Sequence, residues 1–218
     1  MFYCPACMSD VAAWEPGPGG RPNATCPHCR SLERHRFLSI VLRDLKLYTQ
    51  TASRVLEYAP QPQVRKILKN QVGEGRYVGI DLMDERFLDA KTDACNLPFV
   101  DDSFDLMVQF HVLEHIPDDA AAISEMARVL KPGGIAFVQV PYRDSVLTEE
   151  DPDASPEERT RRFGQVDHIR YYGTDFNDRL RDNGFDISYR TAADIVPEKR
   201  RKRCNILAAD PLWICRPS

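Results

Sequence analysis

The stretch that decides the fold is SFDLMVQFHVLEHIPDDAAAISEMARVLKPGGIAFVQVP, residues 103–141. Its short apolar run at 104–110 is typical of a buried strand in a parallel sheet. Apolar residues then recur at the i, i+3, i+4 and i+7 spacing of one helix face: Ile123, Met126, Ala127 and Leu130. The segment KPGG at 131–134 is predicted to end this helix, and residues 135–140 to form a second buried strand. The stretch therefore predicts a strand–loop–helix–strand unit of an α/β fold.

The loop that follows the first of these strands contains two histidines and a glutamate, within residues 109–115. In an open α/β sheet, ligands bind beyond the carboxyl ends of the strands. We therefore expect Gln109, Phe110 and His111 to lie at a ligand site. The alternative for the apolar residues of the loop is that they only pack it against the core.

FDLMVQFHVLEHIPD followed by RVLKPGG resembles the central block of class I S-adenosylmethionine-dependent methyltransferases of the type 11 kind. The resemblance covers nearly the whole chain. It implies a Rossmann-like seven-stranded methyltransferase sheet with an antiparallel edge strand, preceded by a small zinc ribbon. It also implies an enzyme whose cofactor is S-adenosylmethionine, and it is not specific for a substrate.

Length and charge set bounds on the class of protein. A chain of 218 residues can hold one α/β domain and a small appendage. The formal net charge of -4 argues against a generally basic surface that coats nucleic acid, although a local basic patch is possible. No apolar run is long enough to span a membrane, and the N-terminus does not resemble a secretory signal. We therefore expect a cytoplasmic protein.

Two CxxC pairs near the N-terminus predict a metal site. Cys4 and Cys7 form the first pair, and Cys26 and Cys29 form the second. Each pair can present two thiolates from one tight turn, and two turns complete a tetrahedron around structural zinc. The alternative, a redox CxxC, requires one pair and does not explain two. The residues between the pairs are rich in glycine and proline and cannot form a core without a metal.

Three segments are predicted from these patterns: a zinc-ribbon knuckle at 1–30, a linking helix at 31–50 and a Rossmann-like methyltransferase domain at 51–218. CPHCRSLERHRFL resembles the N-terminal ribbon of one type 11 subgroup. Arg30, Arg34, His35 and Arg36 could face either substrate or water, and the solvated interpretation is preferred.

The turn after the first predicted strand departs from the methyltransferase pattern. The strand ends near Glu57, where the family places an acidic residue followed by glycines that let the backbone approach the cofactor. Here Ala59 and Pro60 replace the glycines. Two interpretations compete: a variant turn that still binds the cofactor, and a decayed site. We favour binding because the ribbon-bearing subgroup has a similar turn.

Two further segments are predicted to contact the cofactor. The second strand ends at Asp81, followed by Leu82, and an acid in this position hydrogen-bonds ribose hydroxyls in dinucleotide folds. The segment at 92–99 resembles the part of the family that contacts adenine, which implies that Asp93 accepts from the adenine amino group and that the Ala94 amide donates to the ring. The alternative for Asp93 is a surface acid before a turn.

Residues 142–173 interrupt the α/β rhythm and are predicted to form an insertion, or lid, on the substrate side. His168 is the favoured general base and His111 the alternative, although contact with the cofactor is the simpler role for His111. The residues predicted to bind the methyl acceptor are Tyr142, Arg143, Asp167, His168, Arg170 and Tyr172.

Three functions are compatible with the sequence. The first is methyl transfer to an oxygen or nitrogen of a small molecule such as a sugar or secondary metabolite. The second is methylation of an RNA base, in which the ribbon and the basic run at 199–203 bind phosphate. The third is a non-catalytic adaptor with a degenerate cofactor site. The small-molecule acceptor is preferred, nucleic acid is not favoured, and the oligomeric state is open.

Overall fold

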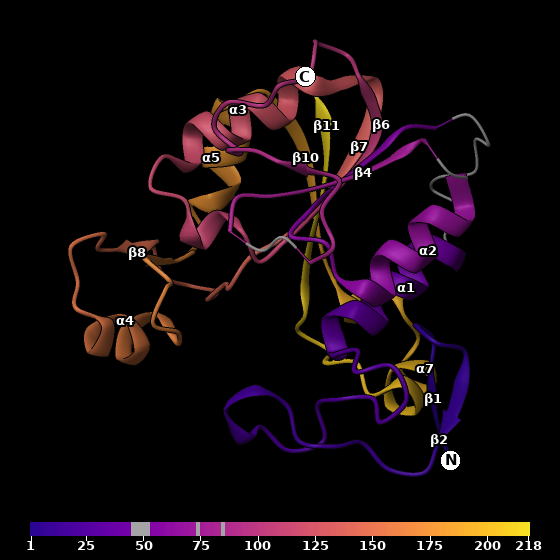
Figure 1. Cartoon of the computed structure of the whole chain (residues 1–218). Coiled ribbons are helices and arrows are strands. Elements are labelled where there is room, and N and C mark those ends of the chain that lie inside the picture. The colour runs from indigo at the N-terminus through magenta and orange to yellow at the C-terminus, as the bar shows by residue number, and fades with distance from the viewer. Residues whose placement is uncertain (45–52, 73–74, 84–85) are drawn as a thin grey trace.

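The computed structural model describes residues 1–44, 53–72, 75–83 and 86–218. Its centre is a seven-stranded sheet in the order β10-β11-β7-β6-β3-β4-β5 (Figure 1). The strands are β3 (Val55–Tyr58), β4 (Tyr77–Asp81), β5 (Ala90–Lys91), β6 (Phe104–Phe110), β7 (Leu130–Gln139), β10 (Phe185–Thr191) and β11 (Pro211–Pro217).

Strand direction confirms the predicted fold class. Strands β3 to β7 pair in parallel, whereas β11 runs antiparallel to both β7 and β10. The edge pair β10–β11 is therefore antiparallel, as predicted. One boundary differs: the helix was expected to include Leu130 and to end at the KPGG segment, whereas α3 ends at Val129 and β7 begins at Leu130 and includes that segment.

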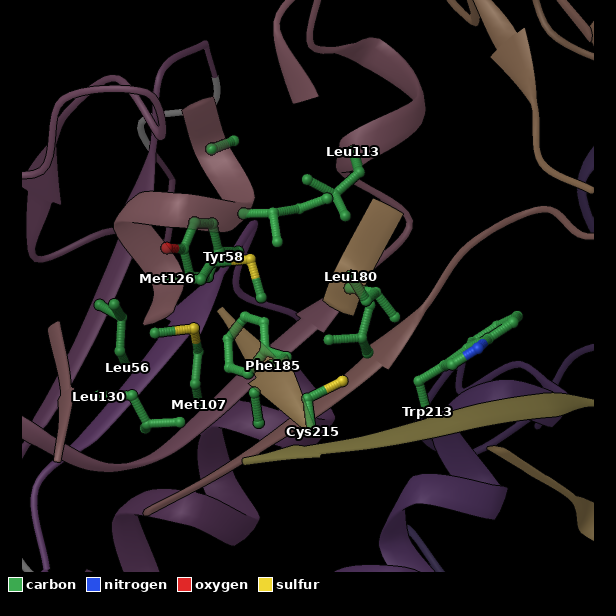
Figure 2. Close-up of a cluster of buried hydrophobic side chains, with 14 of the residues drawn as sticks. Leu56, Tyr58, Met107, Leu113, Met126, Leu130, Leu180, Phe185, Trp213 and Cys215 are labelled. Carbon is green, nitrogen blue, oxygen red and sulfur yellow. The ribbon is translucent and has the colours of Figure 1, made fainter. Parts of the chain in front are cut away.

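Helices cover both faces of the sheet (Figure 1). On one face, α3 (Asp119–Val129) and α5 (Phe176–Asp182) pack on strand residues that include Leu56 and Met107 (Figure 2). On the other face, α1 (Glu33–Asp44) and α2 (Pro62–Val72) pack on their neighbours Val55 and Leu106. Successive strand side chains point to opposite faces, so a strand buried on both sides is apolar throughout. This is why the run at 104–110 is mostly apolar on both faces, with Asp105 and Gln109 as its two polar residues.

The N-terminal knuckle consists of β1 (Phe2–Cys4), β2 (Ser9–Val11) and a 3-10 turn at Pro18–Gly20. It packs beside α7 (Glu198–Cys204), which follows the short helix α6 (Ala192–Ile195). The basic run at 199–203 therefore lies on helix α7, in the connection between β10 and β11. The predicted linking helix at 31–50 contains α1, and residues 45–50 lie outside the described residues.

The insertion at 142–173 is folded. It contains β8 (Glu149–Glu150), α4 (Pro156–Phe163) and β9 (Arg170–Tyr171), with β8 and β9 paired antiparallel. In the view of Figure 1 it projects to the left of the sheet, while the knuckle lies below the sheet. The 3-10 turn η2 (Leu113–His115) lies against β9. In the described ranges, no helix has the length and apolar character needed to cross a membrane.

Candidate active site and metal centre

The four predicted zinc ligands converge. The Sγ atoms of Cys4 and Cys29 are 3.7 Å apart, those of Cys7 and Cys26 are 3.9 Å apart, and all four lie within 4.8 Å of one another. Tetrahedral zinc with Zn–S bonds of about 2.3 Å requires sulfur–sulfur distances of about 3.8 Å. The cluster therefore fits a structural zinc ion, and four thiolates would leave no coordination position open for catalysis.

A hydroxyl supports the cysteine cluster. Ser31 Oγ lies 3.3 Å from the Sγ atoms of both Cys4 and Cys29, and Ser31 is buried. Hydrogen bonds to ligating sulfur atoms orient the ligands and adjust their basicity. Ser31 therefore belongs to the support of the site, a role that the CxxC spacing does not reveal.

Arg36 joins the knuckle to the C-terminal part of the chain, and the expectation that it is solvated is wrong. Its side chain is fully buried and donates hydrogen bonds to the carbonyls of Ala24, Ser31, Cys204 and Asn205. The guanidinium also lies 4.1 Å from the centre of the Trp14 ring. Five donors on a planar group can satisfy several carbonyls at once, so Arg36 fixes the knuckle against α7.

The acid at the end of β3 is part of a buried network. Glu57 accepts from the Tyr77 hydroxyl at 2.6 Å and from the backbone N–H of Gln61 at 3.1 Å. Burial raises the pKa of Glu57 to about 7, although both hydrogen bonds favour the charged form. Glu57 thus orders the turn between β3 and α2.

The glycine-free turn adopts a glycine-like conformation. Ala59 has φ = 45°, in the left-handed region that normally favours glycine. Pro60 is buried, and a Cβ added to Gly79 on β4 would lie 2.6 Å from its ring. The glycine that makes room for this turn therefore lies on the neighbouring strand, 20 positions away in the sequence.

The remaining predicted cofactor residues follow the carboxyl ends of adjacent strands. Asp81 ends β4 and accepts from the Met83 amide at 2.7 Å, while Leu82 is about half exposed. Asp93 follows β5 and accepts from the Cys95 amide at 2.8 Å, with Ala94 between them. Strand β4 is the parallel neighbour of β3, and β5 is the parallel neighbour of β4, so all four residues lie along one edge of the sheet with the Ala59 turn. This set fits S-adenosylmethionine: carboxylates for the ribose and adenine, and exposed apolar surface at Leu82.

In the loop at residues 109–115, called the central loop below, a histidine contacts a buried carboxylate. His111 has φ = 57°, and its Nδ1 lies 3.1 Å from Oε1 of Glu114, which is fully buried. Burial opposes the charge on Glu114, but the interactions with His111, the hydrogen bond first among them, outweigh it and lower the pKa of that carboxyl. The side-chain oxygen of buried Gln109 accepts hydrogen bonds from the backbone N–H groups of Val112 and Leu113 and so holds the loop. These two contacts define the orientation of the Gln109 side-chain amide.

A pocket of about 550 Å³ opens where this loop meets the knuckle and the insertion. Its walls include His111 and His115 from the central loop, Tyr142 after β7, and Asp167 and His168 from the insertion. His168 is almost completely buried, its Nδ1 lies 3.0 Å from the Phe163 carbonyl, and burial lowers its pKa. Of the predicted acceptor residues, Tyr142, Asp167 and His168 are therefore brought together.

The other three predicted acceptor residues do not line this pocket. Arg170 is buried and donates to the carbonyls of Leu113, Ile116 and Pro117. Tyr172 is fully buried and donates to Asp119 at 2.8 Å. Arg143 donates to the Arg162 carbonyl within the insertion. Their contacts favour a role in holding the insertion against the central loop, and the placement of Arg170 and Tyr172 corrects the expected contact with substrate.

Sequence patterns missed the contribution of the N-terminal segment to this pocket. Arg21, Glu33 and Arg34 line it, together with Asp210 from the segment before β11. Arg21 pairs with Glu33 at 2.9 Å, and burial raises the pKa of Asp210 to about 6. The charge density of SLERHR was the available signal, but charge alone does not distinguish a pocket wall from a solvated face.

Comparison with known proteins identifies the central part of the chain. Residues 43–138 match a family described as a methyltransferase domain. This segment is a methyltransferase domain. It contains β3 to β6, most of β7 and the central loop, and so includes every residue predicted to contact the cofactor.

Curated relatives match part of the chain. A probable S-adenosylmethionine-dependent methyltransferase of Mycolicibacterium smegmatis is 42% identical over 60 residues, which are 28% of this chain and 23% of that protein. A demethylmenaquinone methyltransferase of Staphylococcus haemolyticus is 54% identical over 43 residues, 20% of this chain and 18% of that protein. The chain thus spans less than a quarter of the length of these relatives.

Solved structures agree with the fold of the methyltransferase domain. A chain from the complex of the Haloferax volcanii Trm112 methyltransferase activator with a methyltransferase gives a TM-score of 0.58 at 19% identity, covering 84% of this chain and 90% of that one. An S-adenosylmethionine-dependent methyltransferase from Mesorhizobium loti also gives 0.58, at 17% identity, covering 83% and 97%.

Proposed function

We propose that the protein is an S-adenosylmethionine-dependent methyltransferase that methylates an oxygen or nitrogen of a small molecule. The observation that carries this proposal is the pocket of about 550 Å³ beside the central loop. Its size is within the range of roughly 300–1,000 Å³ typical of small-molecule sites. The name of the demethylmenaquinone methyltransferase relatives supports a small acceptor.

In this proposal the cofactor lies along the carboxyl ends of β3 to β6. When bound, S-adenosylmethionine supplies a methyl group on a positively charged sulfur. Asp81 would hold the ribose hydroxyls, and Asp93 and Ala94 would hold the adenine. The backbone at Ala59 and Pro60 would contact the rest of the cofactor. The other residues expected beside the cofactor are Glu57, Leu82, Gln109 and Phe110. The protein then aligns the acceptor with the methyl group and excludes water, which requires little covalent chemistry.

His111 is the general base that the geometry favours for a hydroxyl or ammonium acceptor. Its Nδ1 faces the Glu114 carboxylate, which leaves Nε2 as the ring nitrogen able to take a proton, and the residue lines the pocket. His168 is less exposed, with a side chain only 4% accessible compared with 27% for His111. Of the two candidates from the sequence, we therefore place His111 ahead of His168.

Arg34 indicates the charge of the acceptor. It lines the pocket, burial lowers its pKa, and no hydrogen bond or salt bridge joins its side chain to any residue that the structure describes. The charges of Glu114, Glu33 and Asp210 act on Arg34 only at longer range. A partly buried guanidinium without a hydrogen-bonded partner is costly, and an anionic ligand would relieve this cost. We therefore propose that the acceptor carries a carboxylate or phosphate that binds Arg34.

The test is a product search with methyl-labelled S-adenosylmethionine and a metabolite extract, fractionated by anion exchange. We expect label in small molecules retained on the column, with incorporation reduced about 10²–10⁴-fold in His111→Ala and unchanged in His28→Ala, an exposed histidine outside the pocket. Labelled RNA would favour the nucleic-acid alternative. No incorporation into any fraction would contradict the proposed activity.

A further inference from the structure

A second group of metal-ligating side chains lies outside the cysteine cluster. Glu114 and His115 on η2 and His168 on the insertion each offer one ligand atom, and these atoms lie within 4.8 Å of one another. Apart from the cysteines, this is the only such group in the described ranges of the chain. The two parts of the group are more than 50 residues apart in the sequence, so the fold creates it.

Two buried acceptor atoms in this group have no partner among the described residues. Glu114 is fully buried, and while its Oε1 accepts from His111, its Oε2 has no hydrogen bond. His168 is 3% exposed and its Nε2 is also unpaired, 3.9 Å from Glu114 Oε1. Leaving two such atoms unsatisfied is costly, and a positive or donating group between them would remove that cost.

The hydrogen bonds of both histidines leave the nitrogen that metals bind unprotonated. Nδ1 of His168 lies 3.0 Å from the Phe163 carbonyl, and Nδ1 of His115 lies 3.1 Å from the Asp167 carbonyl. A carbonyl only accepts, so Nδ1 carries the proton in each ring and Nε2 holds a lone pair. Metal-ligating histidines commonly donate their other N–H to a carbonyl in this way.

We propose that Glu114, His115 and His168 form a second metal site that takes a divalent first-row transition ion such as Mn²⁺ or Fe²⁺. Two imidazoles and one carboxylate are a recognised donor set for such ions, and three protein ligands leave positions open for another molecule. His115 and His168 also line the pocket proposed for the acceptor. The site would thus bind an acceptor oxygen and ease the loss of its proton, a role that rests on the proposed function.

Charge sets the expected affinity. The site has one carboxylate, and Glu114 also interacts electrostatically with the nearby cation Arg34. A second cation in the same pocket experiences repulsion from Arg34, which opposes very tight binding. We therefore expect dissociation constants on the order of micromolar, compared with much tighter binding at the four-cysteine cluster.

The probe is Mn²⁺ alone, added to the zinc-loaded full-length protein and followed by the electron paramagnetic resonance signal of the unbound ion. Mn²⁺ prefers nitrogen and oxygen donors to thiolates, so it reports on this site without displacing zinc. We expect one Mn²⁺ per chain, bound at least tenfold more weakly by Glu114→Gln and by His168→Gln. His28→Gln and Glu157→Gln, which change an exposed histidine and an exposed glutamate, should bind Mn²⁺ as the wild type does.

Circular dichroism and zinc content identify any variant that fails to fold. If one of Glu114→Gln and His168→Gln does not fold, Mn²⁺ binding by the other variant tests the proposal. No loss of the unbound Mn²⁺ signal with the wild-type protein, or Mn²⁺ binding by both variants that is as tight as that of the wild type, would overturn the proposal. A water that donates to both unpaired atoms would then account for the gap. The outcome is separate from the proposed function. Methyl transfer that persists after removal of Mn²⁺ and Fe²⁺, with zinc retained, overturns the role of the second site in loss of the acceptor proton and leaves the methyltransferase activity standing.

Discussion

At the scale of single residues, Glu57 links protonation to folding. Burial raises its pKa from 4.5 to about 7, so between these values the folded state holds a proton that the unfolded state has lost. The contribution of Glu57 to stability is therefore fully present below about pH 4.5 and is lost as the pH rises to about 7. The full effect is on the order of 3 kcal/mol.

Glu57→Gln removes this titration, so its free energy of unfolding should lose the part of the pH dependence that Glu57 causes. The measurement is urea unfolding of both proteins without cofactor at about pH 5 and about pH 8. The wild type should lose on the order of 3 kcal/mol more than the variant between the two conditions. An equal loss in both would show that Glu57 ionises in the folded protein as it does in the unfolded chain.

Asp81 carries the most direct residue-level prediction for the cofactor. Its carboxylate ends β4 at the edge where the ribose is proposed to lie. Asp81→Ala should weaken S-adenosylmethionine binding by on the order of 2 kcal/mol, roughly thirtyfold, because a charged acceptor for two hydroxyls is lost. Calorimetry provides the test, with Asp186→Ala, an exposed acid on β10, as the control. Affinity within twofold of the wild type would place the ribose elsewhere.

At the scale of secondary-structure elements, Arg36 connects the knuckle, α1 and α7. Arg36→Met would remove its hydrogen bonds to four carbonyls and leave buried acceptors unpaired. We expect the free energy of unfolding to fall by about 3 kcal/mol or more. Arg190→Met, on the exposed surface of β10, should change it by less than about 0.5 kcal/mol. A similar small effect for Arg36→Met would show that the knuckle is held by other contacts.

The knuckle itself has a predicted metal content and a predicted role. Metal analysis should find one zinc per chain, absent from a Cys26→Ser, Cys29→Ser double variant. Because the segment that follows the knuckle lines the pocket through Arg34, while the cofactor edge comes from β3 to β6, the variant should lose methyl transfer and keep cofactor binding. Iron in place of zinc would contradict the metal assignment, and loss of cofactor binding would contradict the division of roles.

At the scale of the whole molecule, the sheet could be predicted from local sequence patterns, because each strand and helix forms from residues that are neighbours in the sequence. The run at 104–110, the helix face at 123–130 and the two CxxC pairs each form from residues that lie close together. The Ala59 turn could not be explained in this way, because the space for Pro60 comes from Gly79 on another strand. The burial of Arg36 depends on Cys204, 168 positions away, and no local pattern contains that contact.

In the candidate site too, some residues could be identified from the sequence, whereas others required the three-dimensional structure. His111 and His168 were identified by residue type and by position relative to predicted strands. Their partner Glu114 and the pocket wall at Arg34 were not, since these roles require the central loop, the insertion and the knuckle to meet in three dimensions. Arg170 and Tyr172 were placed in the acceptor site because they lie near His168 in the sequence. In the structure, Arg170 on β9 and Tyr172 directly after it are both buried.

The most direct test of the central claim is calorimetric titration of the wild-type protein with S-adenosylmethionine. The claim is that the glycine-free turn at Ala59 and Pro60 still forms a cofactor site at the carboxyl ends of β3 and β4. We predict one cofactor bound per chain, with a dissociation constant in the micromolar range. Absence of binding at cofactor concentrations up to about 1 mM would contradict it and indicate a methyltransferase fold that has lost its cofactor.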